Sequence, residues 1–254
     1  HIFRTTEIWR RLSSNQNNCI TLIFKAITNG FIHIVDESEH TNGRRWEDGM
    51  IPRLIVKAHI AAGHRSAESA AGIAHSMTWH RAFAAIEFGR VPVVAVLHGA
   101  VVGGGLELAC ATHIRVAERS AFYALPEGQR GIFVGGGGSV RIPRLIGVAR
   151  MMDMMLTGRV VDAAEGQAIG LAQYLVDDGA GLGKALEIAR AIAGNAPMTN
   201  FAVIQALPRI AESAPAQGLM MEALMAAIAQ GEGEAKRRLV DFLAKRAAKV
   251  GVPG

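Results

Sequence analysis

Hydrophobic and polar positions along this chain follow two different periods. The uninterrupted apolar run at residues 91–97 predicts a strand. Residues 19–24 indicate a second strand, and residues 171–176 a short third one. Apolar residues at helical spacing predict a helix over residues 148–156, and a polar start with a closing glycine predicts a capped helix over residues 162–170.

The pattern changes at residue 183, after which every periodic segment is helical. We expect helices over residues 184–193, 200–207, 216–229 and 234–249. Their apolar faces cannot all be buried within this region. The chain is therefore expected to be an α/β core, residues 1–182, followed by a C-terminal helical region, residues 183–254; apart from the strand at residues 19–24, the sequence does not assign residues 1–50.

The first candidate for chemistry is a glycine-rich turn that carries an acid. Gly103, Gly104 and Gly105 lie between the apolar run and a helix-like stretch at residues 106–111, with Glu107 in its first turn. The N–H groups of a helix N-terminus are free to bind a ligand oxygen, and glycine lets that oxygen approach closely. A carbonyl that gains negative charge during a reaction would be stabilised there. Alternatively, Glu107 only complements the helix dipole.

A second acid and a second glycine run follow. Glu127 comes twenty residues after Glu107 (127 − 107), and another glycine-rich turn begins at Gly135 and leads into a helix. Two carboxylates beside one polarised carbonyl suit proton transfer and water activation, provided that their surroundings give them different protonation tendencies.

The order and spacing of several motifs resemble those of the enoyl-CoA hydratase/isomerase family, the crotonase superfamily. The resemblance covers about residues 90–178 well and the C-terminal helices moderately. It rests on VPVVAVLHGAVVGGGLELAC at 91–110, AFYALPE at 121–127, GIFVGGGGS at 131–139, RLIG at 144–147, LTG at 156–158 and AIGL at 168–171.

The resemblance implies a fold and a set of roles. It implies a crotonase (ClpP-like) α/β fold, in which repeated ββα units form a spiral core and C-terminal helices build trimers or hexamers. It also implies that the Gly104 amide is half of an oxyanion hole and that Glu107 and Glu127 are the catalytic carboxylates. Hydratases of the family keep both acids, whereas many isomerases keep only the second. The expected activity is therefore that of an enoyl-CoA hydratase.

The second oxyanion donor is where this chain departs from the family pattern F-x-A-G-x-D. The nearest match is AHIAAGHR at residues 58–65, in which Ala62 and Gly63 fit but Ile60 replaces the aromatic residue and Arg65 the acid. The match assigns Ala62 to substrate binding and the backbone amide of His64 to the oxyanion hole, since an N–H is present whatever the side chain.

Charge and the C-terminal sequence bear on coenzyme A. The formal net charge is +5, and basic residues crowd the last predicted helix. The segment FLAKR at 242–246 resembles the family's F-x-E-K-R tail, which implies that Phe242 and Lys245 bind coenzyme A; Gly135 is expected to line the same site. Nucleic acid is the rival partner for a basic surface, but we do not expect it, because aromatic residues make up only 6% and no RNA-binding motif is visible.

Composition and cysteine use complete the expectations. The 254 residues, 50% of them hydrophobic, suffice for a sizeable core, and no secretory signal or membrane span is recognised. Two cysteines indicate no disulfide framework, which fits a cytoplasmic location. His75 and His80 are five residues apart, which is unsuited to a metal site, so we expect no metal and no cofactor, coenzyme A being part of the acyl-CoA substrate.

Other functions remain open at this point. The same oxyanion hole would serve an enoyl-CoA isomerase or a hydratase-lyase acting on an aromatic enoyl-CoA. A catalytically silent homologue that binds RNA or a protein is another class, and a purely structural oligomer is a third. The two acids argue against a silent protein, and a structural oligomer would not need glycines aimed at a carbonyl.

Overall fold

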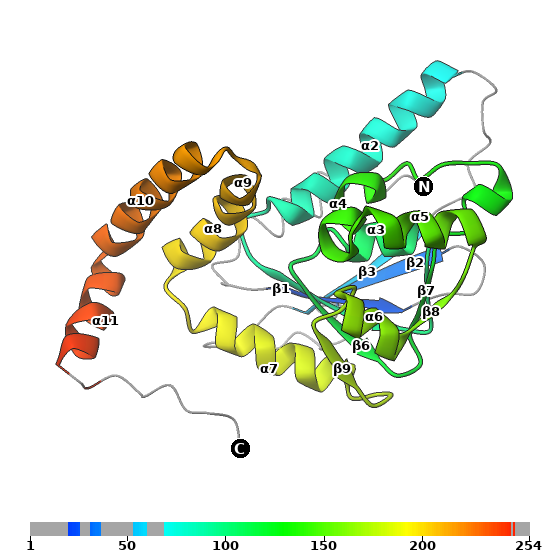
Figure 1. Ribbon diagram of the computed structural model, residues 1–254. Coiled ribbons are helices and arrows are strands. Elements are labelled where there is room, and N and C mark those ends of the chain that lie inside the picture. The colour runs from blue at the N-terminus through cyan, green and yellow to red at the C-terminus, as the bar shows by residue number, and fades with distance from the viewer. Residues whose placement is uncertain (1–19, 26–30, 37–52, 60–68, 245, 247–254) are drawn as a thin grey trace. The chain divides into compact units, whose positions relative to one another are not determined.

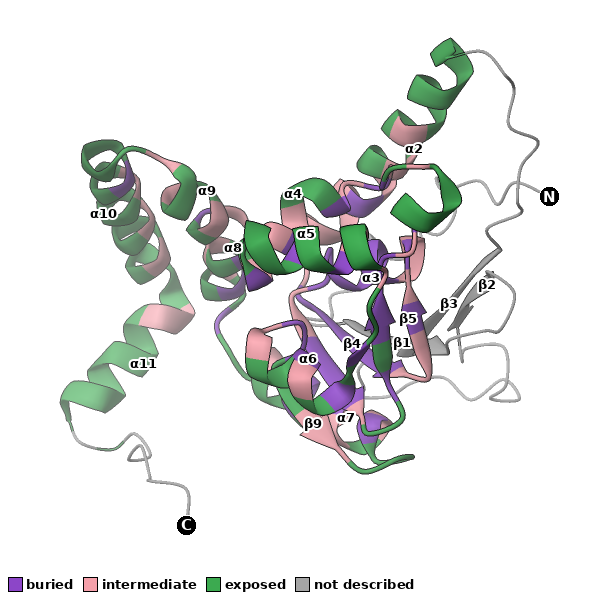
Figure 2. Cartoon of the chain, turned by 45° about the vertical axis from the view of Figure 1, so that its right-hand side comes forward, coloured by how far each residue is buried: buried purple, intermediate pink, exposed green. Residues whose placement is uncertain are grey.

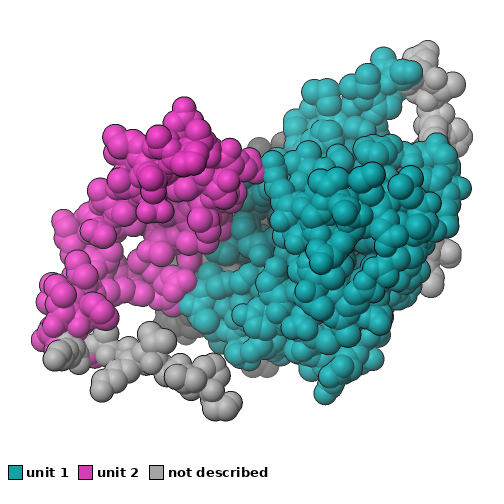
Figure 3. Space-filling view, in the orientation of Figure 1, with its two compact units in different colours: residues 1–193 teal, residues 194–254 magenta. Residues whose placement is uncertain are grey.

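The computed structural model describes residues 20–25, 31–36, 53–59, 69–244 and 246 of the chain (Figure 1). The chain forms two compact units, residues 1–193 and 194–254, coloured separately in Figure 3. Helix α7 (Gly181–Ala193) packs on the sheet of the first unit, against strands β1, β4 and β6.

The first unit is built on a six-stranded, mostly parallel sheet with the order β2-β3-β1-β4-β6-β9. Strand β2 is antiparallel to both β1 and β3, and the other pairings are parallel. The strands are β1 (Ile20–Lys25), β2 (Phe31–Asp36), β3 (Arg53–His59), β4 (Val93–His98), β6 (Ile114–Glu118) and β9 (Tyr174–Val176).

The strand predicted from the apolar run at residues 91–97 is confirmed as β4, and it is buried on both faces. Val93, Ala95 and Leu97 belong to the main core, which lies on one side of the sheet. Val94 and Val96 point to the opposite side and pack in a second cluster with residues of α7. Because successive side chains of a strand alternate between faces, one uninterrupted apolar run builds both cores.

A smaller sheet was not expected from the sequence. Its three strands, in the order β5-β7-β8, are β5 (Ala100–Val102), β7 (Phe122–Ala124) and β8 (Val161–Asp162). Strand β5 follows β4 after a single turn residue, Gly99, whose φ of 59° favours glycine. The apolar run therefore does not lead directly into the glycine turn, as the sequence suggested, because the chain first enters this second sheet.

The helices of the first unit confirm the predicted helical segments. They are α2 (Ser69–Glu87), α3 (Gly104–Ala109), the 3-10 helix η2 (Gly128–Arg130), α4 (Gly138–Ile146), α5 (Val148–Thr157), α6 (Ala163–Ile169) and α7. Helix α6 is capped as expected: Asp162 Oδ1 accepts the N–H of Glu165 at 2.8 Å, and Gly170 ends the helix in the left-handed region.

The second unit consists of the helices α8 (Pro197–Gln205), α9 (Leu207–Glu212), α10 (Pro215–Gly231) and α11 (Gly233–Leu243). The helix predicted over residues 200–207 ends two residues early, because Pro208 sits in the first turn of a new helix, where a missing N–H costs nothing. Most of α10 and α11 is exposed (Figure 2). In the described residues, no helix is both long and apolar enough to cross a membrane.

Candidate active site

The pairing of two short strands brings the two glutamates into one site. Strands β5 and β7 are parallel, with Val102 opposite Ala124. The backbone continues this register, since the N–H of Gly103 donates to the carbonyl oxygen of Ala124 at 3.0 Å. The chain leaves β5 into α3, which carries Glu107, and leaves β7 toward Glu127. Sheet pairing thus joins two residues that the sequence separates by twenty positions.

Gly103 has two reasons to be glycine. It begins α3 with a φ of 55°, in the left-handed region that side chains rarely adopt. In addition, a Cβ at this position would lie 2.6 Å from Oε1 of Glu127. The carboxylate of Glu127 therefore lies directly against the turn that opens α3.

Glu107 is buried, with 5% of its surface exposed, and is held by the second glycine turn. Its Oε1 atom accepts the backbone N–H groups of Gly136 and Gly138, each at 2.8 Å. A Cβ at Gly138 would lie 2.8 Å from Cγ of Glu107, so the turn approaches the acid as closely as only glycine permits. Two backbone donors therefore fix the orientation of this carboxylate.

Glu127 is buried to a similar degree but is held differently. Within the part of the chain that the structure describes, its Oε2 atom is buried without a hydrogen-bond partner. Burial raises the pKa of Glu127, and the negative charge of Glu107 adds to the rise, although a hydrogen bond from its own backbone and the charge of Arg130 lower the pKa in part. Glu127 is thus inclined to keep a proton that an exposed glutamate would lose.

The remaining predicted site residues fall into three groups. Gly104 is the first residue of α3, where an N–H has no acceptor within the helix, and Gly135 precedes the turn that binds Glu107, with its Cα side facing Ser76 of α2. Phe242 lies in α11 of the second unit and is 67% exposed. Ala62, His64 and Lys245 lie outside the described residues. The structure thus brings together Gly104, Glu107 and Glu127, with Gly135 in the adjoining turn.

Sequence reasoning missed the role of Gly136 and Gly138 as backbone donors to Glu107. The signal for them was present, because residues 135–138 are four consecutive glycines. A run of glycines predicts a turn, but it does not say which side chain will use its N–H groups. In the described residues, no group of three or more His, Cys, Asp or Glu side chains is arranged to hold a metal ion.

Known proteins resemble both the sequence and this architecture. The family model described as enoyl-CoA hydratase/isomerase matches residues 49–251. A solved structure from Rhodopseudomonas palustris, provisionally named an enoyl-CoA hydratase, aligns with 72% of this chain and 70% of its own. Its sequence is 64% identical, and the TM-score is 0.69. An enoyl-CoA hydratase from Bacillus anthracis is 25% identical, with a TM-score of 0.74, over 95% of this chain and 84% of that one.

Curated relatives match over shorter segments. The fatty acid oxidation complex subunit alpha of Shewanella amazonensis is 46% identical over 114 residues, which are 44% of this chain and 16% of that protein. The mitochondrial methylglutaconyl-CoA hydratase 1 of Pyricularia oryzae is 46% identical over 95 residues, which are 37% of this chain and 27% of that protein. Most of each curated relative therefore lies outside the match.

The family model covers most of the chain, and solved structures share its mixed α/β architecture. The crotonase fold expected from the sequence is confirmed. This chain belongs to the enoyl-CoA hydratase/isomerase family, within the crotonase superfamily of enzymes.

Proposed function

We propose that this protein is an enoyl-CoA hydratase, which adds water across the 2,3 double bond of an enoyl-CoA thioester. The observation that carries the proposal is the meeting of Glu107 and Glu127, two buried carboxylates that each lie against a glycine turn. Their different surroundings support a division of labour between two acids of the same type.

The reaction begins with polarisation of the thioester carbonyl. The N–H of Gly104, with that of His64, donates to the carbonyl oxygen and draws electron density out of the double bond. The oxygen of a water molecule can then bond to the β-carbon, while negative charge develops on the thioester oxygen. Loss of one such donor typically removes about 2.7–4 kcal/mol of transition-state stabilisation.

The two glutamates handle the water and its protons. Glu107 holds and orients the water through Oε2, since its Oε1 is occupied by the N–H groups of Gly136 and Gly138. Glu127 takes a proton from the water as the new C–O bond forms, and it returns a proton to the α-carbon. The raised pKa of Glu127 favours this exchange, because a catalytic acid and base works best near the operating pH. These steps use neither a metal nor a redox cofactor.

Hydration is favoured over isomerisation because both acids are present and buried together. The acyl group is a separate question. One relative is named as a subunit of a fatty acid oxidation complex and another as a methylglutaconyl-CoA hydratase, so straight-chain and branched thioesters both belong in the test. An aromatic enoyl-CoA tests the hydratase-lyase alternative.

The test follows the absorbance of the conjugated enoyl thioester with crotonyl-CoA, methylglutaconyl-CoA and one aromatic enoyl-CoA. We expect the protein to remove this absorbance, and Glu127→Gln to slow the reaction by on the order of 1000-fold, because general acid–base catalysis typically contributes about 10²–10⁴. The matched control is Glu187→Gln, an exposed glutamate on α7. Absence of hydration with every substrate, despite binding of coenzyme A, would exclude the hydratase.

We further propose that the second unit builds a homotrimer or hexamer. We also propose that Phe242, Lys245 and Gly135 contact coenzyme A and that the protein acts in the cytoplasm. The support is a set of exposed apolar side chains on α10 and α11: Leu219, Met220, Leu224, Ile228, Leu239, Val240, Phe242 and Leu243. Light scattering coupled to size exclusion checks the assembly, and a monomer at micromolar concentration would refute it.

The contact with coenzyme A is tested separately. Loss of coenzyme A affinity in Phe242→Ala, with assembly intact, is the expected result.

A further inference from the structure

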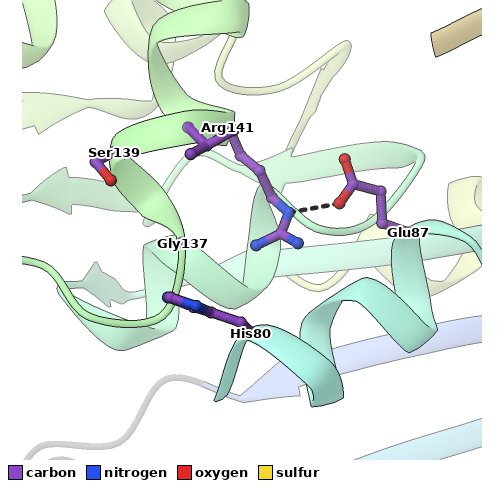
Figure 4. A pocket seen from close by; sticks show the side chains of 6 residues that line it. His80, Glu87, Gly137, Ser139 and Arg141 are labelled. Atoms are coloured by element: carbon purple, nitrogen blue, oxygen red, sulfur yellow. Dashed lines mark hydrogen bonds and ion pairs between the residues drawn. The ribbon is translucent and has the colours of Figure 1, made fainter. Parts of the chain in front are cut away.

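An ion pair lies behind the glycine turn that holds Glu107. Arg141, in α4, donates through Nε to Oε2 of Glu87, at the end of α2, at 2.8 Å (Figure 4). The side chains are only 10% and 22% exposed, so both charges are largely removed from water. Exposed pairs in the same unit, such as Arg119 with Asp177, are far more open to solvent.

Arg141 joins Glu87 to the turn itself. Its Nη1 atom donates to the carbonyl oxygen of Gly136 at 3.2 Å, while Nε is bonded to Glu87. The guanidinium also packs over Gly137, where a Cβ would lie 2.5 Å from Nη1. One planar side chain therefore holds the same peptide segment whose N–H groups bind Glu107.

The position of this cation is not explained by the helix that carries it. Arg141 is the fourth residue of α4, near the N-terminus, where the helix dipole disfavours positive charge. Burial of an ion pair adds a desolvation cost, so such a pair is weak support for stability alone. The gain that remains is geometric, because the fork of an arginine can fix two acceptors at once.

Glu87 is in turn fastened to the central sheet. Its carbonyl oxygen accepts from Nε2 of His113 at 3.0 Å, and Nδ1 of the same ring accepts the N–H of Val93, at the start of β4, at 2.9 Å. These two bonds require the neutral ring, and burial lowers the pKa of His113, which favours that form. A continuous series of contacts thus runs from β4 through Glu87 and Arg141 to the turn.

We propose that Arg141 and Glu87 are positioning residues for Glu107: the ion pair holds the Gly136–Gly138 turn at the distance that orients the Glu107 carboxylate toward the reacting water. The inference rests on the proposed hydratase function. Neither residue touches the reacting atoms. Their contribution passes through the backbone of the turn.

The kinetic test uses Arg141→Lys, which keeps the charge but loses the two-pronged contact, and Glu87→Gln, which keeps the shape but loses the charge. We expect each to lower kcat by about 100-fold, as small misplacements of catalytic groups do, with KM for the thioester unchanged. Arg119→Lys is the matched control, because its ion pair has the same 2.8 Å separation but lies at the surface. Thermal unfolding shows which variants are folded, and Glu87→Gln serves if Arg141→Lys is not.

A double variant separates positioning from general damage. In a Glu107→Gln background, Arg141→Lys should cause little further loss of kcat, since the acid it positions is already absent. Losses that multiply fully would overturn the proposal and assign the pair a merely structural role. Full kcat in both single variants would overturn it as well.

A final measurement stands apart from activity. Amide hydrogen exchange of Gly136 and Gly138 should speed up at least tenfold in Arg141→Lys and stay unchanged in Arg119→Lys. Unchanged exchange in Arg141→Lys would refute the proposal that the ion pair holds the Gly136–Gly138 turn, even in an inactive protein. If the unaltered protein shows no hydration but exchange is accelerated in the variant, the hydratase function is refuted. The role of the ion pair in holding the turn is then retained.

Discussion

Glu107, in helix α3, and Glu127, in the turn after β7, are both buried, but their carboxylates are held in different ways. At Glu107, the backbone N–H groups of Gly136 and Gly138 donate to one oxygen. At Glu127, the described residues offer Oε2 no hydrogen-bond partner, and burial raises the pKa. Two acids of the same type therefore differ because backbone donors fix one carboxylate, whereas burial without a partner for Oε2 leaves the other ready to exchange a proton.

The largest effect should come from filling the space beside the fixed acid. In Gly138→Ala the new methyl group would meet Cγ of Glu107, so the acid must move and catalysis should fall by on the order of 1000-fold. Hydration kinetics measure this, with Gly183→Ala as control because a Cβ there meets nothing within 4 Å. Activity within a few-fold of the unaltered enzyme in both variants would show that the fit around Glu107 is not needed.

Truncation of the two acids should separate them by stability. Glu107→Ala leaves two buried N–H groups without an acceptor, and we expect it to lower the free energy of unfolding by about 3 kcal/mol. Glu127→Ala removes an acid whose Oε2 has no described partner, so its cost should be clearly smaller. Urea unfolding of both variants at pH 7 measures the two losses in the free energy of unfolding. Equal losses would contradict the difference in how the two carboxylates are held.

A more conservative change at Glu127 should raise stability. Because the pKa of Glu127 is raised, the native protein holds this proton more tightly than the unfolded chain does, and ionisation opposes folding at neutral pH. Glu127→Gln should therefore be more stable at pH 7, by roughly 1 kcal/mol as for a buried unsatisfied group. The difference should shrink as the pH falls through the raised pKa toward 4.5. A gap that does not depend on pH would contradict the assigned cause.

The smallest expected effect concerns the charge of Arg130, which lowers the pKa of Glu127. In Arg130→Gln that pKa should rise. The acidic limb of the profile of kcat/KM against pH should therefore move to slightly higher pH. Because Arg130 is exposed, the shift should be lost at high salt. Arg119→Gln controls for a general change in surface charge. A downward shift would mean that Glu127 does not set this limb.

Patterns that extend over many residues were predictable from the sequence. The run at residues 91–97 predicted strand β4, helical spacing predicted α5, and a polar start with a closing glycine predicted α6. Strands β5, β7 and β8, of two or three residues, are too short to carry a period. Two helices in place of one over residues 197–212 depend on the position of Pro208 within a turn.

The site was predictable only in part. Glu107 and Glu127 were identified through glycine context and family resemblance, but their meeting depends on the register of β5 with β7, which no spacing reveals. The donors to Glu107 are backbone groups. The ion pair of Arg141 with Glu87 joins two residues, on different helices, that are 54 positions apart in the sequence. Such contacts leave no local signature, because they arise only after the chain has folded.

The parallel pairing of β1 with β4 has a consequence for handling the protein in pieces. Thr21 lies opposite Val94, a separation of 73 residues (94 − 21). A fragment that begins after residue 25 would turn β4 into an edge strand, with unpaired backbone groups on the side that faces β1 and apolar side chains on both faces. Edges of this kind recruit strands from other molecules and aggregate. The six residues of β1 therefore protect an edge of β4 that would otherwise be open to association with other molecules.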